Sequence, residues 1–256
     1  MPTTGAKPQG ATVEASAARA VREMFDAIAP RYYLLNHLLS ANVDRLWWRR
    51  AARRFCTVLE NPDAAVLDIC CGTGDMTMAL LKRRPRDARP ILAADFAREM
   101  LNRGVKKFGV GARKAGEAYA VPLEADALHL PLRSESLDLI VSAFGFRNLA
   151  NYEAGLKEFH RVLKPGGQLG ILEFSEPGGL VGKAYAVYFR RVLPAIGRAI
   201  CGKDGPYNYL PTSVGNFPAP EEMLGLMSAA GYEQCAWQPY TFGIAGLYTA
   251  RRNAVA

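Results

Sequence analysis

Cysteine and histidine are scarce in this sequence. Its 256 residues include 5 Cys and 3 His. An odd number of cysteines in a chain of this length does not form a disulfide framework, and it indicates a reducing compartment. The cysteines lack the spacing of a zinc site, and the histidines are scattered along the chain. These observations exclude a disulfide-stapled scaffold, and we predict no metal site.

Long apolar runs are also missing. The N-terminal residues lack the apolar core of a signal peptide. No later window holds the roughly 18 uncharged apolar residues of a helix that spans a bilayer. We therefore expect a cytoplasmic protein, with residues 1–18 as a flexible N-terminal tail and without internal repeats.

The composition is that of a globular protein with a basic charge balance. Hydrophobic residues make up 50% of the chain and charged residues 22%, which excludes a disordered or fibrous chain. Lys and Arg number 32 against 24 Asp and Glu, a formal net charge of +8, which suggests an anionic surface or ligand. We expect residues 19–256 to form a single domain.

Residues 19–60 are predicted to be helical. An apolar stripe begins near Arg19 and stops at Pro30. Between residues 45 and 58, apolar side chains repeat at helical spacing on one face and arginines line another; they are Trp47, Ala51, Phe55 and Val58, and Arg45, Arg49 and Arg53. A charge run of this kind usually faces water, so we expect a solvated basic helix.

From residue 65 onward, short apolar runs alternate with helical stretches. The runs are AVLDIC, ILAAD, AYAVPLE, LDLIVSAF and GQLGILEF. Apolar runs without strict polar alternation suit strands buried on both faces of a mainly parallel sheet. The chain ends with two strands that we expect to be joined at Gly243. The pattern predicts an α/β fold with helices on both faces of the sheet.

A turn with two glycines follows the first of these strands, in VLDICCGTGDMT. Gly72 and Gly74 lie between the strand and a helix that Asp75 would open, so a ligand can approach the backbone closely. The dinucleotide fingerprint requires a third glycine where this chain has Thr77. On its own, the motif fits a plain tight turn as well as a ligand loop.

Acidic residues accompany three successive strands. Asp95 ends the second strand, 21 residues beyond Gly74, a spacing at which doubly wound sheets bind ribose hydroxyls. The alternative role of Asp95 is to cap the helix that starts near Ala97. Asp68 lies within the first strand and needs donors or a cationic ligand, and Asp126 follows the third. This much negative charge favours S-adenosylmethionine over a pyrophosphate dinucleotide.

Several longer segments resemble a known family over residues 21–250. They are RYYLLNHLLS, RLWWRR, VLDICCGTGD, ADFAREML, FGFRNLANYEAGLKEFHRVLKPGG, LEFSEP and YNYLPTSVGNFPAPEEMLGLMSAAGYE. The chain resembles class I S-adenosylmethionine-dependent methyltransferases and, more narrowly, the ubiquinone/menaquinone biosynthesis C-methyltransferase family. The glycine loop and VLKPGG occur in many methyltransferases, whereas FGFRN, LEFSEP and YNYLPTSV are more specific.

The resemblance implies a Rossmann-like fold with a seven-stranded, mainly parallel sheet whose last strand is antiparallel. It implies a helical substrate cap over residues 19–60 and a basic, apolar lid inserted at residues 178–220. The cofactor contacts that we expect on this basis are Asp68, Gly72, Thr73, Gly74, Asp95, Asp126, Ala127 and Ala143. Departures from the family pattern occur at Cys70 and Cys71, where Ala-Gly is usual, and at Ala143, where serine is common.

The family reaction methylates a ring carbon of a prenylated quinol. Such a carbon becomes nucleophilic when a ring hydroxyl is deprotonated, so the enzyme must stabilise a phenolate-like charge. We expect Arg147 to supply a cation, Asn148 a neutral donor and Tyr32 a second polar contact, with water as the proton carrier. In the alternative, Arg147 only pairs with an acid such as Glu173.

Residues 180–203 combine basic side chains with apolar and aromatic ones and contain no acid. The basic residues are Lys183, Arg190, Arg191, Arg198 and Lys203. Such a segment can lie on an anionic membrane and open a path for the prenyl tail, or it can be an ordinary lid helix. We expect transient contact at the inner face of the cytoplasmic membrane. The sequence is compatible with a homodimer and does not decide between a monomer and a dimer.

Other functions are weaker alternatives. An RNA methyltransferase fits the fold and the charge, but the chain has no appended RNA-binding module and no Asn-Pro-Pro-Tyr type tetrapeptide, so we expect no nucleic acid partner. A non-catalytic scaffold would not need acids beside three strands. Of the two quinols we favour demethylmenaquinol, because Tyr33 and Asp44 depart from the pattern of dual-function enzymes; the benzoquinol precursor of ubiquinone is the alternative.

Overall fold

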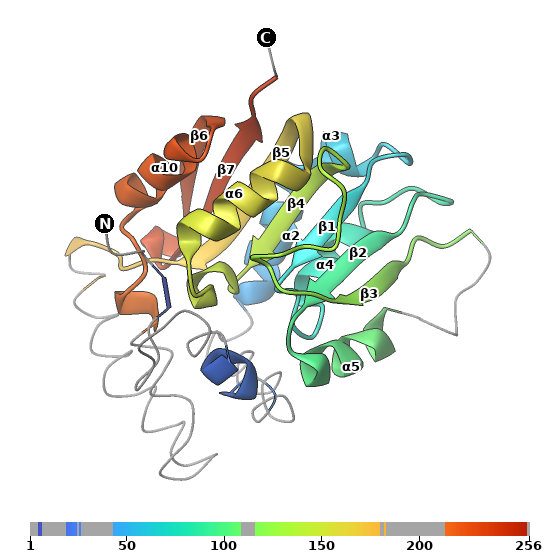
Figure 1. Ribbon diagram of the computed structural model, residues 1–256, viewed down its shortest axis with the longest axis horizontal. Coiled ribbons are helices and arrows are strands. Elements are labelled where there is room, and N and C mark those ends of the chain that lie inside the picture. Colours follow the sequence, from blue (N-terminus) through green and yellow to red (C-terminus); the bar gives the residue numbers. More distant parts are fainter. Residues whose placement is uncertain are drawn as a thin grey trace.

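A seven-stranded sheet with the order β3-β2-β1-β4-β5-β7-β6 forms the centre of the protein (Figure 1). The computed structural model describes residues 5–6, 19–24, 26, 43–108, 116–179, 182 and 213–254. The strands are β1 (Val66–Ile69), β2 (Ile91–Asp95), β3 (Ala120–Glu124), β4 (Leu137–Ala143), β5 (Leu163–Phe174), β6 (Tyr232–Tyr240) and β7 (Ala245–Arg252).

The pairing of the strands creates a switch point beside β1. β1 pairs in parallel with both β2 and β4, β2 pairs with β3, and β4 pairs with β5. β7 lies between β5 and β6 and is antiparallel to both, and η4 (Thr241–Gly243) joins it to β6. The predicted sheet and its terminal hairpin are therefore confirmed. In such sheets ligands bind beyond the carboxyl ends of the strands at the switch point.

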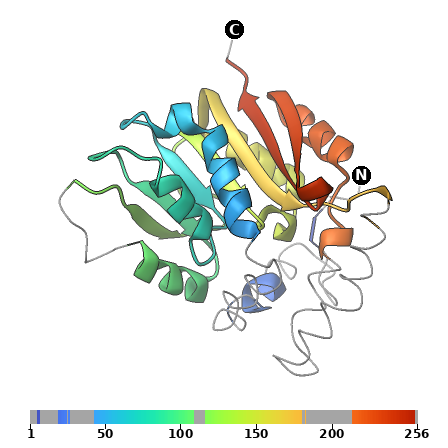
Figure 2. The same cartoon turned by 180° about the vertical axis from the view of Figure 1, so that it is seen from behind.

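Helices cover both faces of the sheet (Figures 1 and 2). One face carries α2 (Asp44–Arg54), α3 (Cys56–Leu59), α4 (Asp75–Leu81) and α5 (Arg98–Lys107), and the other carries α6 (Tyr152–Val162) and α10 (Pro220–Ala229). Each helix layer buries a separate apolar cluster against the strands. Burial on both faces explains why the strand sequences are continuously apolar, as predicted.

The basic helix predicted over residues 45–58 is broken into α2 and α3. Trp47 and Ala51 are buried, while the predicted arginine face is exposed, which confirms the solvated basic face. The helix is interrupted at Phe55, whose backbone has φ −108° and ψ 18°. The Phe55 ring packs on Gly170 of β5, where a Cβ atom would lie 2.4 Å from Cζ of the ring. The sheet can therefore accept this ring only where the strand has no side chain.

Three of the predicted segments are described only in part. Of the predicted tail, Gly5 and Ala6 are described, and the Ala6 amide donates to the carbonyl of Leu149 at 2.8 Å. Of the predicted cap, residues 19–24 are helical, while α2 and α3 belong to the helix layer on the sheet. Most of the predicted lid, including residues 183–203, lies outside the described residues. The tail, the cap and the lid stay predictions.

Candidate active site at the carboxyl edge of the sheet

The turn between β1 and α4 has the backbone geometry that its glycines predict. Gly72 and Gly74 have φ values of 55° and 81°, in the left-handed region that favours glycine. A Cβ atom at Gly74 would lie 2.2 Å from the ring of Phe108, so the turn closes against residues beside α5. A Cβ atom at Gly72 would lie 3.5 Å from Met100 Cε, an ordinary contact distance that leaves space beside the backbone. Thr73 is buried and donates to Asp75 at 3.0 Å.

Asp95 connects the second strand to this turn. Its Oδ2 accepts from the Gly72 amide at 2.8 Å, and its Oδ1 accepts from the Ala97 amide at 2.9 Å, just before α5 begins at Arg98. Burial raises the pKa of Asp95 to about 6, and the amide hydrogen bonds partly offset that rise. The alternative role as a helix cap is wrong, because Ala97 is the N-cap residue of α5 and no side chain caps this end; Asp95 instead holds the turn that leads into the helix. Each carboxylate oxygen can accept a further hydrogen bond, so ribose binding is compatible with it.

Asp68 is a fully buried acid in the middle of β1. Its Oδ2 accepts from the Thr77 hydroxyl at 2.5 Å, and its Oδ1 has no hydrogen-bond partner among the described residues. Burial raises the pKa of Asp68 to about 7, with a smaller contribution from the nearby Asp95 charge. Thr77, which stands where a dinucleotide motif has its third glycine, thus holds this acid in place. Sequence reasoning did not assign Thr77 that function.

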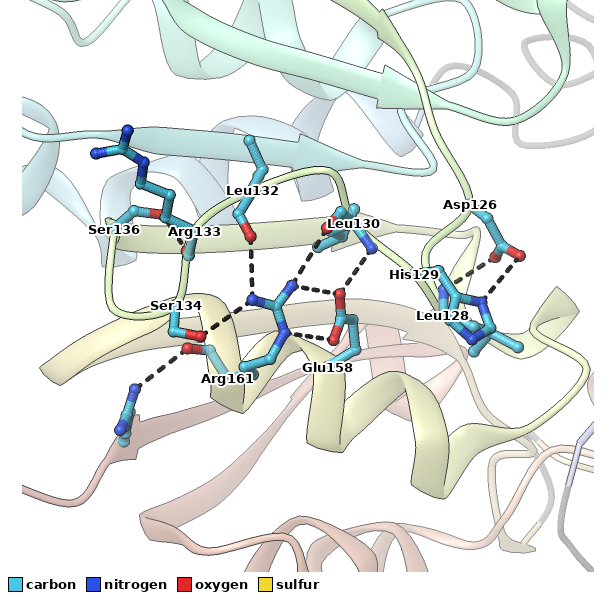
Figure 3. A network of polar contacts seen from close by, with 11 residues as sticks. Asp126, Leu128, His129, Leu130, Leu132, Arg133, Ser134, Ser136, Glu158 and Arg161 are labelled. Atoms are coloured by element: carbon cyan, nitrogen blue, oxygen red, sulfur yellow. Dashed lines mark hydrogen bonds and ion pairs between the residues drawn. The ribbon is translucent and has the colours of Figure 1, made fainter.

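Asp126 lies on the loop that follows β3, at the same sheet edge as Asp95. The two strands pair so that Asp95 stands opposite Glu124, and the Ala125 amide donates to the Asp95 carbonyl at 3.1 Å. The Asp126 carboxylate accepts from the Leu128 amide at 2.9 Å and lies 3.7 Å from Nδ1 of His129 (Figure 3). The Asp126 side chain is 52% exposed, so it is accessible to a ligand.

Two charged residues of α6 hold this loop against the sheet (Figure 3). Glu158 accepts from the Leu130 amide at 2.7 Å and pairs with Arg161 at 2.7 Å. Arg161 in turn donates to the carbonyls of Leu130 and Leu132. The Arg161 contact lowers the pKa of Glu158, which keeps the carboxylate ionised. The loop that carries Asp126 is therefore fixed by a charge-assisted network.

Arg147 lies in η1 (Phe146–Asn148), immediately after β4, and forms a buried ion pair. Its Nη1 lies 2.8 Å from Oε2 of Glu173, and its backbone amide donates to Oε1 at 3.0 Å. Nη1 also donates to the carbonyl of Phe144. The exposed fractions of the two side chains are 6% and 0%. The alternative pairing of Arg147 with Glu173 is thus present in the structure.

The other residues predicted for the substrate side and the end of β4 are Asn148, Ala143 and Tyr32. Asn148 follows Arg147, is buried, and its Oδ1 has no hydrogen-bond partner in the part of the chain that the structure describes. Ala143 ends β4 and is half-buried. Tyr32 lies outside the described residues.

An aromatic wall, formed by Trp47, Phe144 and Phe174, stands beside the Arg147–Glu173 pair. The rings of Phe144 and Phe174 are 4.5 Å apart between centroids, and Trp47 lies 5.8 Å and 6.0 Å from them. The Arg147 guanidinium lies 5.4 Å from the centroid of the Phe174 ring. Sequence reasoning missed this wall, although Phe144 and Phe174 end two of the predicted strand runs.

The charges at this edge fit a cationic ligand. Within the described ranges, neither Asp68 nor Asp95 forms an ion pair, and backbone amides and one hydroxyl are their donors. A sulfonium or ammonium group would compensate these buried carboxylates. The described residues contain no cluster of His, Cys, Asp and Glu that could hold a metal ion. The site can therefore bind S-adenosylmethionine through this chain's own acids and the glycine turn.

The model of the ubiE/COQ5 methyltransferase family matches residues 12–252. The chain belongs to this family. It is 45% identical to a protein of Thermus thermophilus over 90% of this chain and 100% of that protein, and 44% identical to one of Deinococcus radiodurans over 92% and 93%. Both relatives are named demethylmenaquinone methyltransferase. A relative from Geobacter sulfurreducens, 40% identical over 91% of this chain and 88% of its own, is named ubiquinone/menaquinone biosynthesis C-methyltransferase.

Solved structures confirm the fold. A SAM-dependent methyltransferase from Thermotoga maritima covers 91% of this chain and 100% of its own, with a TM-score of 0.60 and 17% identity. Magnesium protoporphyrin IX methyltransferase from Synechocystis covers 92% and 99%, with a TM-score of 0.60 and 13% identity. The expected class I fold is confirmed. As a member of the ubiE/COQ5 family, the protein is an S-adenosylmethionine-dependent methyltransferase.

Among the helices of the described residues, none has both the length and the apolar run that crossing a bilayer requires.

Proposed function

We propose that this protein methylates a ring carbon of demethylmenaquinol to give menaquinol. The observation that carries the proposal is the 44–45% identity, over at least nine tenths of each chain, to two relatives with that activity in their names. The benzoquinol precursor of ubiquinone is the second candidate, because a relative at 40% identity is named for both pathways.

The proposed cofactor site uses the turn and the acids of β1, β2 and β3. S-adenosylmethionine supplies an electrophilic methyl group on a cationic sulfur. We assign its binding to Asp68, Gly72, Thr73, Gly74, Asp95, Asp126, Ala127 and Ala143. The acids would compensate the ligand's positive charges, and the open backbone at Gly72 would admit the ligand closely. Asp95 is suited to the ribose hydroxyls by its place at the end of β2.

The proposed substrate side lies at the ends of β4 and β5. Arg147 would stabilise the phenolate-like charge that makes the ring carbon nucleophilic, with Asn148 and Tyr32 as further polar contacts and water carrying the proton. The pairing with Glu173 at 2.8 Å orients the guanidinium and also reduces its net positive charge. The aromatic wall would provide an apolar surface for the ring of the quinol.

The prenyl tail would bring the enzyme to a membrane surface. We propose transient, peripheral contact with an anionic leaflet at the inner face of the cytoplasmic membrane, in which the basic residues of 180–203 take part. A homodimer is one assembly that light scattering would test. No nucleic acid takes part in the proposed reaction.

Mass-resolved methyl transfer tests the proposal. The protein is incubated with S-adenosylmethionine and, in parallel, reduced demethylmenaquinol, the reduced benzoquinol precursor, both oxidised quinones, or RNA. A gain of one methyl group only on the reduced naphthoquinol supports the proposal, and methylation of both quinols would widen it to both pathways. If cofactor binds but neither quinol is methylated, the quinone assignment is wrong.

A further inference from the structure

A strained turn at the tip of the β6–β7 hairpin exposes a phenylalanine to solvent. Phe242 is 82% exposed, the largest exposure among the large hydrophobic residues that the structure describes. Its backbone has φ 57° and ψ 23°, and Thr241 before it has φ 46°. Left-handed geometry at a bulky residue is a genuine outlier and is energetically unfavourable. Such strain persists when the surrounding structure imposes it, and it often marks a functional position.

Two hydrogen bonds impose the conformation of this tip. Nε1 of the buried Trp47 donates to Oγ1 of Thr241 at 2.7 Å. On the other side, the Ser175 hydroxyl donates to the carbonyl of Gly243 at 2.6 Å. The residues before and after Phe242 are thus anchored to α2 and to the end of β5. The phenyl ring is held outward by the fold.

The helix that contacts the tip, α2, begins with exposed apolar and basic side chains. Arg45 and Arg49 are exposed, Leu46 is 51% exposed, and none of the arginines of α2 forms an ion pair within the described residues. Leu46 is the chain neighbour of Trp47, which contacts the tip, and the Arg50 guanidinium lies 4.6 Å from the ring centroid of Tyr240. The hairpin tip and the start of the helix that contacts it thus carry an exposed aromatic ring, an exposed leucine and exposed cations, and we call these residues the tip surface (Arg45, Leu46, Arg49, Phe242).

The tip surface lies at the same edge of the sheet as the candidate active site. β6 runs antiparallel to β7, and β7 runs antiparallel to β5, so β6 ends at the carboxyl edge of β5. Trp47 also contacts Phe144 and Phe174 of the aromatic wall. In Figure 2 the start of α2 and the hairpin tip both lie at this lower edge. A partner bound to the tip surface would therefore face the site.

We propose that the tip surface docks the enzyme on an anionic bilayer, with Phe242 inserted among the acyl chains and Arg45 and Arg49 against headgroup phosphates. The inference rests on the proposed function to the extent that a prenylated substrate resides in the bilayer. Docking at this edge turns the site toward the membrane, so that a quinol ring reaches the aromatic wall while its tail stays in lipid.

A bilayer fits this surface better than a protein partner does. A stable protein interface buries at least roughly 1,000 Å² around an apolar core. Two exposed apolar side chains among arginines do not provide such a core. Interfacial membrane binding needs only a few inserted apolar groups together with cations near anionic headgroups. The charge of the tip surface complements an anionic leaflet, and its single outward ring suits shallow insertion.

Vesicle cosedimentation tests the proposal. The vesicles contain equal parts of phosphatidylcholine and phosphatidylglycerol and no quinone. Phe242→Asn should lower binding about tenfold, because Asn tolerates left-handed backbone while the apolar ring is lost. Phe242→Trp should retain binding. Arg45→Gln combined with Arg49→Gln should lower it about thirtyfold, at roughly fivefold for each cation near the surface.

A matched control uses the other end of the same helix. Arg53→Gln combined with Arg54→Gln removes the same charge, but these residues lie on average about 10 Å further along α2, a distance comparable to the Debye length at 0.1 M salt. This pair should lower binding less than threefold. Equal losses for the two pairs would overturn the proposed location, and so would unchanged binding of the Phe242→Asn protein. If that variant instead turns a dimer into a monomer without changing vesicle binding, the occupant is a second copy and the proposal is wrong.

Methyl transfer to a short-chain quinol in detergent separates this inference from the proposed function. The tip variants should keep wild-type turnover there, because none of them alters the candidate site. If wild-type protein binds vesicles through the tip surface but methylates no quinol, the proposed function fails and the docking surface stands. If it methylates the quinol but the tip variants bind vesicles normally, the docking proposal fails alone.

Discussion

The two sides of the candidate site each contain a buried acid, and they differ in whether that acid has a cationic partner. At the β1–β3 side, Asp68 is fully buried, and its charge meets a hydroxyl but no cation among the described residues. At the β4–β5 side, Glu173 is equally buried and has Arg147 at 2.8 Å. Burial raises the pKa of Asp68 to about 7. The buried acid at the β1–β3 side therefore lacks a cation among the described residues, whereas the buried acid at the β4–β5 side is paired with one.

This difference indicates where a cationic ligand belongs. A buried carboxylate without a cation is costly unless a ligand supplies the charge. The β1–β3 side is therefore suited to a sulfonium or ammonium group. The β4–β5 side, with its guanidinium against aromatic rings, is suited to a flat ring that develops negative charge.

The largest expected effect comes from breaking the pair at the β4–β5 side. Arg147→Met leaves Glu173 charged and alone, so the free energy of unfolding should fall by about 3–5 kcal/mol. Loss of the guanidinium should also lower kcat by about 100-fold to 1,000-fold, the usual effect of removing one charge-stabilising donor. Denaturant unfolding and methyl transfer at saturating S-adenosylmethionine measure the two effects.

A second substitution separates stability from chemistry at this pair. Adding Glu173→Gln removes the buried charge, so most of the lost stability should return while kcat stays low. The activity profile should also move to higher pH, because the quinol must then ionise without help. Recovery of activity in the double variant would mean that Arg147 acts only by stabilising the fold.

At the β1–β3 side, Asp68→Asn should have a smaller effect on activity and the opposite effect on stability. Asn can still accept from Thr77 and carries no buried charge, so the ligand-free protein should gain on the order of 2 kcal/mol at neutral pH. S-adenosylmethionine should bind about tenfold more weakly, because the acid that compensates its charge is gone. Calorimetry measures both quantities. A variant that loses stability would show that the Asp68 carboxylate does not destabilise the ligand-free protein.

The pH dependence of the ligand-free protein follows from the same acids. Burial raises the pKa of Asp68 to about 7 and that of Asp95 to about 6, above the ordinary value near 4. The folded protein then binds protons more tightly than the unfolded chain. The free energy of unfolding should therefore fall as pH rises from about 4 to about 7, and level off above. Unfolding curves across this range, with Asp68→Asn as the flatter control, check the sign.

Sequence reasoning succeeded where a local pattern determines the geometry. The apolar runs predicted the strands, the glycines predicted the tight turn, and the position of Asp95 at the end of a strand predicted its place at the sheet edge. These features depend on neighbours in the chain and on the rules of parallel sheets.

Features that depend on packing between distant segments were not predictable in the same way. The break at Phe55 depends on Gly170, and the anchoring of the hairpin tip depends on Trp47 and Thr241. The sequence offers the Arg147–Glu173 pair only as an alternative, because it shows that both residues lie at or after the ends of predicted strands but not that their side chains meet. The family resemblance identified the reaction and left these contacts undetermined.

The substitution with the smallest predicted effect is at the loop that carries Asp126. Glu158→Gln removes the charge that holds Arg161 and weakens the hydrogen bond from Leu130. The free energy that holds the loop in place should therefore fall by about 1–2 kcal/mol. Because this loop belongs to the β1–β3 side, S-adenosylmethionine affinity should fall about threefold while kcat at saturating cofactor stays unchanged. Glu153→Gln, on the first turn of the same helix, is the matched control. A fall in kcat with unchanged affinity would mean that the loop serves the β4–β5 side, and the division of the edge into two sides would then be wrong.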